Sequence, residues 1–294
     1  MILITGASGK TGRALVRGLS KVESICAFVH REEHVAVLKS LGAEKVVVGD
    51  LRDEAAVRSA MQGARSVYHI CPNMSPDEVL IGKLVIEEAR KAGVEHIVYH
   101  SVLHPQTEKM KHHWGKMRVE ETIFESGLPF TILQPAPYMQ NLLAGWKSIV
   151  EEGALRVPYS VDSKFSFVDL EDLAEAAKIV LTEPIHINAI YELAGTFPMS
   201  HLEVAEIISQ VLKRDVRAEK EEIGDWRLHA ERSSEGTQSK RDAYALENLI
   251  KMFTYYDQWG LMGNSTVLKW LLKREPVSLE TFVERTVKER NVIH

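Results

Sequence analysis

The sequence is poor in the features that mark several protein classes. It has two cysteines, Cys26 and Cys71, among 294 residues, and both stand in apolar runs that predict strands. Two core thiols in a chain of this length indicate a reducing compartment and argue against a disulfide framework. No apolar run reaches the ~18 residues that a membrane-spanning helix needs. No segment repeats at a fixed interval, which excludes a solenoid.

A large charge of one sign is also absent. Lys and Arg number 36 against 41 Asp and Glu, for a formal net charge of -5. A mildly acidic chain has no general attraction for nucleic acid or for an anionic membrane surface, so neither is expected as a partner. The chain opens directly into an apolar run at Met1. That start leaves no room for a signal peptide and predicts a cytoplasmic protein.

The first half of the chain alternates short apolar runs with amphipathic stretches. Strands are predicted over 1–5, 24–29, 44–48, 66–70, 95–99 and 130–133. Helices are predicted over 10–19, 33–41, 53–61, 77–91 and 111–126. Short apolar strands separated by helices are typical of right-handed βαβ crossovers and a buried parallel sheet. The sequence therefore predicts an α/β fold with a doubly wound parallel sheet of the Rossmann type.

The second half has a looser rhythm. Helices are predicted over 139–151, 170–181, 201–212, 241–256, 266–273 and 279–289, with a β-rich stretch over 153–167 and a strand over 189–193. The polar segment 231–240 is predicted to be a mobile loop. We therefore expect a Rossmann domain over 1–150 and a smaller C-terminal α+β lobe over 151–294, with some segments of the lobe returning to the first domain.

A glycine-rich segment joins the first predicted strand to the first predicted helix: Gly6-Ala7-Ser8-Gly9-Lys10-Thr11-Gly12. In dinucleotide-binding units one glycine permits a tight turn, one lets the backbone approach the pyrophosphate, and one lets helix and strand pack closely. Free amides and the helix dipole then meet the phosphates. A glycine-rich turn that binds nothing is the alternative, and the position between strand and helix argues against it.

The end of the second predicted strand distinguishes NADP from NAD. Arg31 stands there, and a guanidinium can grip the 2′-phosphate of NADP(H) bidentately. Lys10 adds a second positive charge. Glu32 and Glu33 argue against this interpretation unless they begin the next helix, where carboxylates are favoured. A solvated loop arginine is the alternative for Arg31.

Asp50 and Leu51 follow the third predicted strand. A carboxylate and a small apolar side chain at this point can bracket an adenine ring. Capping of the following helix is an equally good role for Asp50.

The glycine spacing, Gly49-Asp50-Leu51 and the block from Val98 to Asn141 together resemble the NmrA-like family, a branch of the atypical extended short-chain dehydrogenase/reductases. The block holds a strand ending near Ser101, a lysine followed by an acidic helix, and a Pro-x-x-Tyr-Met-x-Asn run that starts at Pro135. Near the C-terminus, Met252-Phe253-x-Tyr255-Tyr256 and Pro276-x-Ser278-Leu279-Glu280 are similar to the redox-sensor branch of that family.

The resemblance implies a set of NADP(H)-binding residues. Beyond the glycine loop, they are Arg31, Asp50, Leu51, Cys71, Pro72, Asn73, Lys83, Lys116, Pro135 and Tyr138. Lys83 can equally be a solvated helix lysine, and Cys71 an inert core thiol.

The wider superfamily also implies a Tyr-x-x-x-Lys pair. The tyrosine donates a proton and the lysine holds the nicotinamide ribose. Lys116 is present, but His112 replaces the tyrosine. A histidine with an ordinary pKa near ~6.5 can act as a general acid around neutral pH. His113 is adjacent, so the histidine in the tyrosine position could be either His112 or His113. Tyr138 is a further candidate for the proton donor.

Adjacent histidines do not face one direction on a helix, so His112 and His113 predict no metal site. Two functions remain. One is an NADPH-dependent reductase of small quinone-like or conjugated compounds. The other is a non-catalytic NADP(H)-sensing regulator with a protein partner. The first is favoured by analogy of fold, and the sequence leaves an oligomer open.

Overall fold

The computed structural model describes residues 1–233 and 240–290. The chain divides into two compact units. The first unit holds residues 1–108, 112–134 and 173–191, and the second holds 109–111, 135–172 and 192–294. A compact unit is not proof of an independently folding domain, so the predicted boundary at residue 150 stays a prediction.

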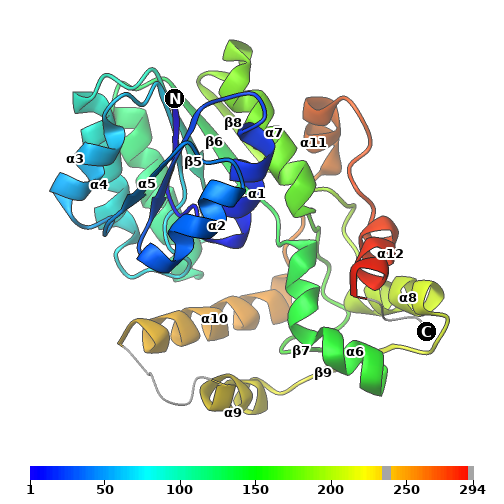
Figure 1. The fold of residues 1–294 in the computed structure, drawn as a ribbon. Helices are drawn as coiled ribbons and strands as arrows, with labels where there is room; N and C mark the ends of the chain where they lie inside the picture. The colour runs from blue at the N-terminus through cyan, green and yellow to red at the C-terminus, as the bar shows by residue number, and fades with distance from the viewer. Residues whose placement is uncertain (234–239, 291–294) are drawn as a thin grey trace. The chain divides into compact units, whose positions relative to one another are not determined.

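A seven-stranded sheet in the order β3-β2-β1-β4-β5-β6-β8 forms the centre of the first unit (Figure 1). Its strands are β1 (Ile2–Ile4), β2 (Ile25–Val29), β3 (Lys45–Val48), β4 (Ser66–His69), β5 (His96–His100), β6 (Phe130–Pro135) and β8 (Ala189–Leu193). β1 pairs in parallel with both β2 and β4. From β1 the strands β2 and β3 are added on one side of the sheet, and β4, β5 and β6 are added on the other. This order confirms the predicted doubly wound sheet.

The strands are recognisable in the sequence because they are buried. Every residue of β1, β2, β4 and β5 is buried, so the apolar residues of these strands follow one another without alternation. β3 lies at one edge of the sheet and is only half-buried. Cys26 lies in β2, but Cys71 lies beyond the end of β4, so its predicted place inside a strand is wrong.

Helices cover both faces of this sheet. They are α1 (Lys10–Leu19), η1 (Glu32–His34), α2 (Val35–Ser40), α3 (Glu54–Met61), α4 (Glu78–Lys91), α5 (Lys111–Glu125), α7 (Leu170–Thr182) and η3 (Pro184–His186). α3, α4 and α5 lie on one face, and α1 and α7 on the other (Figure 1). A Cβ at Gly82 of α4 would lie 2.6 Å from the Val119 side chain of α5, so only glycine permits this close helix packing.

The second unit is mainly helical. Its elements are η2 (Met139–Gly145), α6 (Trp146–Glu152), β7 (Ala154–Val157), α8 (His201–Leu212), β9 (Arg217–Lys220), α9 (Ile223–Ser233), α10 (Lys240–Trp259), α11 (Ser265–Leu272) and α12 (Leu279–Arg290). β7 and β9 form a two-stranded parallel sheet. The start of α7, up to Asp172, also belongs to this unit.

Sequence patterns predict this unit less well. The β-rich stretch expected over 153–167 forms a strand only at β7, because Pro158 follows directly and cannot donate to a ladder. β9 and α9 are polar and escape a search for apolar periodicity. Of the loop predicted over 231–240, Glu231–Ser233 belongs to α9 and Lys240 begins α10, while 234–239 lie outside the described residues.

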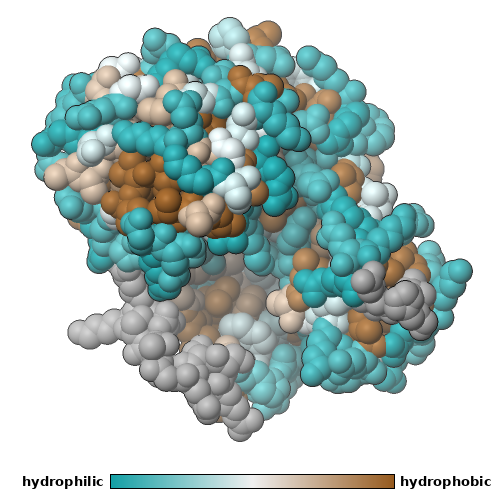
Figure 2. Space-filling view, viewed as in Figure 1, coloured by the Kyte–Doolittle hydropathy of each residue, from teal (hydrophilic) through white to brown (hydrophobic). Residues whose placement is uncertain are grey.

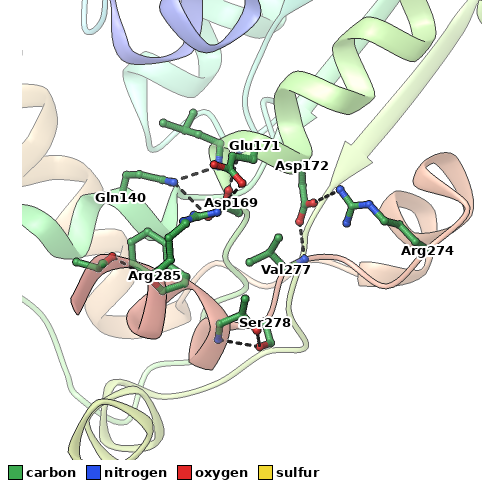
Figure 3. A network of polar contacts seen from close by, with 12 residues as sticks. Gln140, Asp169, Glu171, Asp172, Arg274, Val277, Ser278 and Arg285 are labelled. Atoms are coloured by element: carbon green, nitrogen blue, oxygen red, sulfur yellow. Dashed lines mark hydrogen bonds and ion pairs between the residues drawn. The ribbon is translucent and has the colours of Figure 1, made fainter. Parts of the chain in front are cut away.

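Buried carboxylates at the start of α7 hold the C-terminal part of the second unit (Figure 3). Asp172 accepts hydrogen bonds from Arg274 and from the backbone N–H of Val277, both at 2.7 Å. Asp169 accepts one from Arg285 of α12. Both carboxylates are fully buried, and a buried charge is tolerated only when it is paired and hydrogen-bonded. These contacts therefore fix α12 and the segment before it.

Large hydrophobic side chains remain exposed in both units. Ile185 is 80% exposed, Phe197 74% and Trp270 61%. Figure 2 shows hydrophobic areas within a mostly hydrophilic surface. Scattered apolar side chains are normal on a surface, so an oligomer stays a prediction. No helix of the described residues is long and apolar enough to cross a membrane.

Buried histidines predict a loss of stability in mild acid. Burial lowers the pKa of six of them: His69 and His100 to about 3, His96, His113 and His201 to about 4, and His112 well below its ordinary value. In the unfolded chain their pKa is near ~6.5. Below that pH the unfolded chain binds more protons than the native chain, so stability present above it is lost as pH falls.

The free energy of unfolding, measured by urea titration, should therefore fall steeply between pH 7 and pH 5. Each histidine contributes a slope that approaches about 1.4 kcal/mol per pH unit. Replacing buried His96 with Gln should reduce the slope by up to one proton. Equal stability at the two pH values would contradict this expectation.

Candidate functional site

The three glycines of the loop between β1 and α1 are needed for different reasons. Gly6 has a φ of +59°, and a Cβ there would lie 2.8 Å from the carbonyl oxygen of Ile70. A Cβ at Gly12 would lie 2.5 Å from Cα of Ala7. At Gly9 a Cβ would meet only the Gly6 oxygen, at 3.4 Å. The fold itself thus demands Gly6 for the turn and Gly12 for packing, whereas Gly9 keeps open space over the loop.

The amino terminus of α1 is open. The N-cap residue is Gly9, which has no side chain that could cap the first amides of the helix. Gly9 and Lys10 are exposed and Ser8 is half-buried, while Thr11 is buried. Uncapped amides at the positive end of a helix dipole attract anions. The arrangement fits the pyrophosphate group that the loop predicts.

Arg31 follows the end of β2 as a mainly exposed side chain. Its guanidinium lies 3.4 Å from Glu33, and the two side chains are 68% and 63% exposed. Glu32 and Glu33 form the first turn of η1, which confirms that they begin the next helix. An exposed ion pair of this kind contributes little, so the arginine is free to exchange Glu33 for another anion.

Asp50 does not cap the following helix. Asp53 caps α3 by accepting from the backbone N–H groups of Ala55 and Ala56. Asp50 instead accepts from Nε of Arg52 at 3.0 and 3.2 Å. This contact holds the pKa of the Asp50 carboxyl well below its usual range. Leu51 is buried in the hydrophobic core under the sheet.

Lys116 is the centre of a buried polar cluster in the first unit. It lies on α5 and is 5% exposed. Its ammonium donates to Glu78 Oε1 at 3.0 Å and to the carbonyl oxygen of His100 at 3.1 Å. Tyr99 donates its hydroxyl to the same Glu78 oxygen at 2.8 Å, and its ring lies 5.2 Å from the ammonium. Glu78 is the first residue of α4, where the helix dipole favours a carboxylate.

Two histidines at strand ends complete the cluster. His69 Nδ1 lies 2.8 Å from the hydroxyl of Thr5, and its ring stacks on Tyr99 with centroids 5.8 Å apart. His100 Nδ1 lies 2.8 Å from the hydroxyl of Tyr68. Burial, with the nearby charge of Lys116, lowers the pKa of both histidines to about 3. Lys116 is therefore surrounded by neutral rings.

His112 is buried one helical turn before Lys116. Burial, followed by the charge of Lys116, lowers its pKa well below the ordinary value. These surroundings disfavour the imidazolium form of His112, and its role as a proton donor stays a prediction. His113 Nδ1 lies 3.2 Å from the carbonyl oxygen of His104. His104 has a φ of +54°, so His113 helps to hold a strained turn after β5.

The segment after β4 carries three predicted residues. Cys71 is buried, while Pro72 and Asn73 are exposed. Burial, with the neighbouring carboxylate of Glu78, raises the pKa of the Cys71 thiol well above its ordinary value. A thiol held neutral in this way is inert, which favours the core-thiol interpretation.

The remaining predicted residues do not join the Lys116 cluster. Lys83 is exposed on α4 and lies about 140° around the helix from Glu78 at 3.6 residues per turn. Pro135 ends β6, and Tyr138 belongs to the second unit. Their places against a cofactor stay predictions.

Sequence reasoning missed most partners of Lys116. Glu78, Tyr99 and His69 show no motif, and only their places at strand ends or at a helix start could have singled them out. Glu120 was missed too. It accepts from the hydroxyl of Ser101 and from the side-chain amide of Gln134.

Comparison with known proteins agrees with this geometry. The pattern of the NmrA-like family matches residues 1–285. The chain is 32% identical over 221 residues to the NAD(P)H azoreductase of Xenophilus azovorans, which covers 74% of this chain and 76% of that one. It is 32% identical over 197 residues to quinone oxidoreductase 2 of Escherichia coli strain K12, covering 66% and 68%.

A solved structure extends the likeness to almost the whole chain. The NADPH-dependent quinone oxidoreductase QOR2 of Escherichia coli, complexed with NADPH, matches with a TM-score of 0.84 at 27% identity. The match covers 97% of this chain and 99% of that one. The match to the family pattern over nearly the full length, together with these relatives, shows that the chain belongs to the NmrA-like family.

Proposed function

We propose that this protein binds NADPH and reduces small quinone-like or conjugated compounds. One observation carries the proposal: the N-terminus of α1 follows β1 behind an N-cap glycine, and the buried ammonium of Lys116 donates to the carbonyl at the end of β5 in the same sheet. The relatives named as an NAD(P)H azoreductase and a quinone oxidoreductase support the reaction class. The NADPH complex of QOR2, on the same fold, supports the cofactor.

Each end of the dinucleotide has residues that fit it. The loop amides from Ser8 to Thr11 suit the pyrophosphate, and Arg31 suits the 2′-phosphate. An ammonium has three N–H donors, and Lys116 gives two of them to Glu78 and His100. The third suits a ribose hydroxyl. When bound, NADPH supplies the hydride.

We propose that water or Tyr138 supplies the proton that must accompany the hydride. The Tyr99 hydroxyl is fully buried and already donates to Glu78, and burial disfavours the imidazolium form of His112. Two free, buried cysteines fit the reducing cytoplasm as the place of action.

A second candidate is a non-catalytic NADP(H)-sensing protein with a regulatory protein partner. The observation that favours it is the neutral, buried His112 at the position of the usual tyrosine. A sensor would have the same dinucleotide site as the reductase and would differ only in that it reduces no substrate.

Gly9→Val should abolish NADPH binding and leave the protein folded. A Cβ at Gly9 meets no atom of the fold closer than 3.4 Å, but a side chain there occupies the space where backbone must approach the pyrophosphate. Gly18→Val is the matched control, because it lies on the same helix with nothing within 4 Å of its Cβ. Fluorescence titration with NADPH measures both variants. Normal binding by Gly9→Val would reduce the loop to a structural turn.

Arg31 should set the preference for NADPH over NADH. We expect the wild type to bind NADPH at least tenfold more tightly, which is about 1.4 kcal/mol and within reach of one charge-assisted phosphate contact. Arg31→Ala should remove most of the preference. Arg17→Ala, which removes the same charge from an exposed position on α1, should keep it. Equal wild-type affinities for the two dinucleotides would refute the NADP assignment.

The reaction itself is tested by NADPH oxidation with a panel of quinone, enone and azo acceptors. We expect turnover with at least one acceptor and no dependence of kcat on an ionisation near pH 6.5, because His112 is held neutral. His112→Phe should therefore keep the shape of the pH profile. An ionisation near pH 6.5 that disappears in His112→Phe would restore the histidine mechanism. NADPH binding without turnover on any acceptor would favour the sensor.

A further inference from the structure

Glu78 holds the ammonium of Lys116 from one side. Its Oε1 atom accepts from Lys116 at 3.0 Å and from Tyr99 at 2.8 Å. The side chains of Lys116 and Glu78 are 6% and 5% exposed. With the carbonyl oxygen of His100 as a second acceptor, the ammonium has one N–H left without an acceptor among the described residues. The carboxylate therefore fixes both the place of the ammonium and the direction of its remaining donor.

Glu78 is also the only charged partner in contact with Lys116 among the residues that the structure describes. Glu120, one turn further along α5, has its oxygens occupied by Ser101 and Gln134, and burial raises its pKa toward the neutral form. The other titratable neighbours, on β4, β5, α5 and the segment after β4, are His69, Tyr99, His100, His112, His113 and Cys71. Burial favours the uncharged form of all six.

The Glu78 carboxylate does not have a hydrogen-bond donor at each of its two oxygens, as a purely structural salt bridge would have. Glu78 Oε2 is buried and no donor of the described chain meets it with hydrogen-bond geometry, while the Cys71 thiol, a weak donor, interacts with the Glu78 carboxylate. Structural carboxylates elsewhere in the chain are better satisfied. Glu88, on the same helix, accepts from Arg58 at 2.9 Å and from Lys91 at 2.8 Å, one bond to each oxygen. An unsatisfied buried acceptor calls for a functional explanation.

We propose that Glu78 is a positioning residue for dinucleotide binding, which keeps the ammonium of Lys116 charged and aimed at the nicotinamide ribose. This inference rests on the proposed function. It assigns Glu78 no contact with the reacting atoms. It predicts that the charge of Glu78, rather than its shape, determines the pH range over which the protein binds NADPH.

Glu78→Gln separates charge from shape. The amide keeps the size of the side chain and an acceptor for Tyr99, but it leaves Lys116 as a buried ammonium without a counter-ion. Such a group gives up its proton more readily. NADPH affinity of Glu78→Gln should therefore fall as pH rises from 7 to 9, whereas wild-type affinity stays constant.

The experiment measures the Kd of NADPH across that pH range by fluorescence titration. We expect Glu78→Gln to bind roughly tenfold more weakly at pH 9 than at pH 7, equivalent to about 1.4 kcal/mol. Glu88→Gln is the matched control, since it removes a carboxylate that is 1% exposed from the same helix and should keep the wild-type profile. Lys116→Met should bind weakly at every pH, and adding Glu78→Gln to it should change nothing more.

Glu78→Gln with a wild-type, pH-independent Kd would overturn the proposal. If that variant does not fold, calorimetry on the wild type decides. NADPH binding at pH 9, measured in two buffers of different ionisation enthalpy, should take up no proton, because the Glu78 carboxylate stabilises the ammonium at 3.0 Å before NADPH binds. Proton uptake there would overturn the proposal as well. A wild type that does not bind NADPH at all would refute the proposed function itself, and the inference with it.

Discussion

Lys116 and Glu78 form an ion pair 3.0 Å long in the interior of the first unit. Lys116 comes from α5, Glu78 from the first turn of α4, and the second acceptor of the ammonium is a backbone carbonyl of β5. A buried charge is tolerated only with its partner in place, so this contact fixes two helices against the sheet. The same positive charge helps to keep His69, His100 and His112 neutral. The cluster thus holds one ammonium among uncharged rings.

The glycine loop supplies the complementary half of the proposed function. Gly6 and Gly12 are required by the fold, and Gly9 is not, which leaves the helix amides open at the end of β1. In doubly wound sheets, ligands bind outside the carboxyl ends of the strands where the strand order reverses. Here that reversal lies between β1 and β4. We propose that the N-terminus of α1 holds the pyrophosphate at the middle of the dinucleotide and that the directed ammonium, in the same unit, holds the nicotinamide ribose.

Much of the first unit is predictable because its signals are local. The helix predicted over 10–19 coincides with α1, and the buried strands are continuous apolar runs. The Lys116 cluster is not predictable in this way. An acidic residue at a helix start, such as Glu78, usually just complements the helix dipole, and its pairing with Lys116 spans 38 residues. The loss of charge at His112 follows from burial, which a helical pattern with two adjacent histidines does not reveal. β9 and α9 are largely polar and were not predicted.

A crystal structure of the protein with NADPH bound tests the central claim most directly. The account predicts the pyrophosphate within hydrogen-bond distance of the amides between Ser8 and Thr11, and a ribose hydroxyl on Nζ of Lys116 with the Glu78 contact kept. A dinucleotide bound away from the glycine loop, or a Lys116 side chain turned away from the ribose, would contradict it.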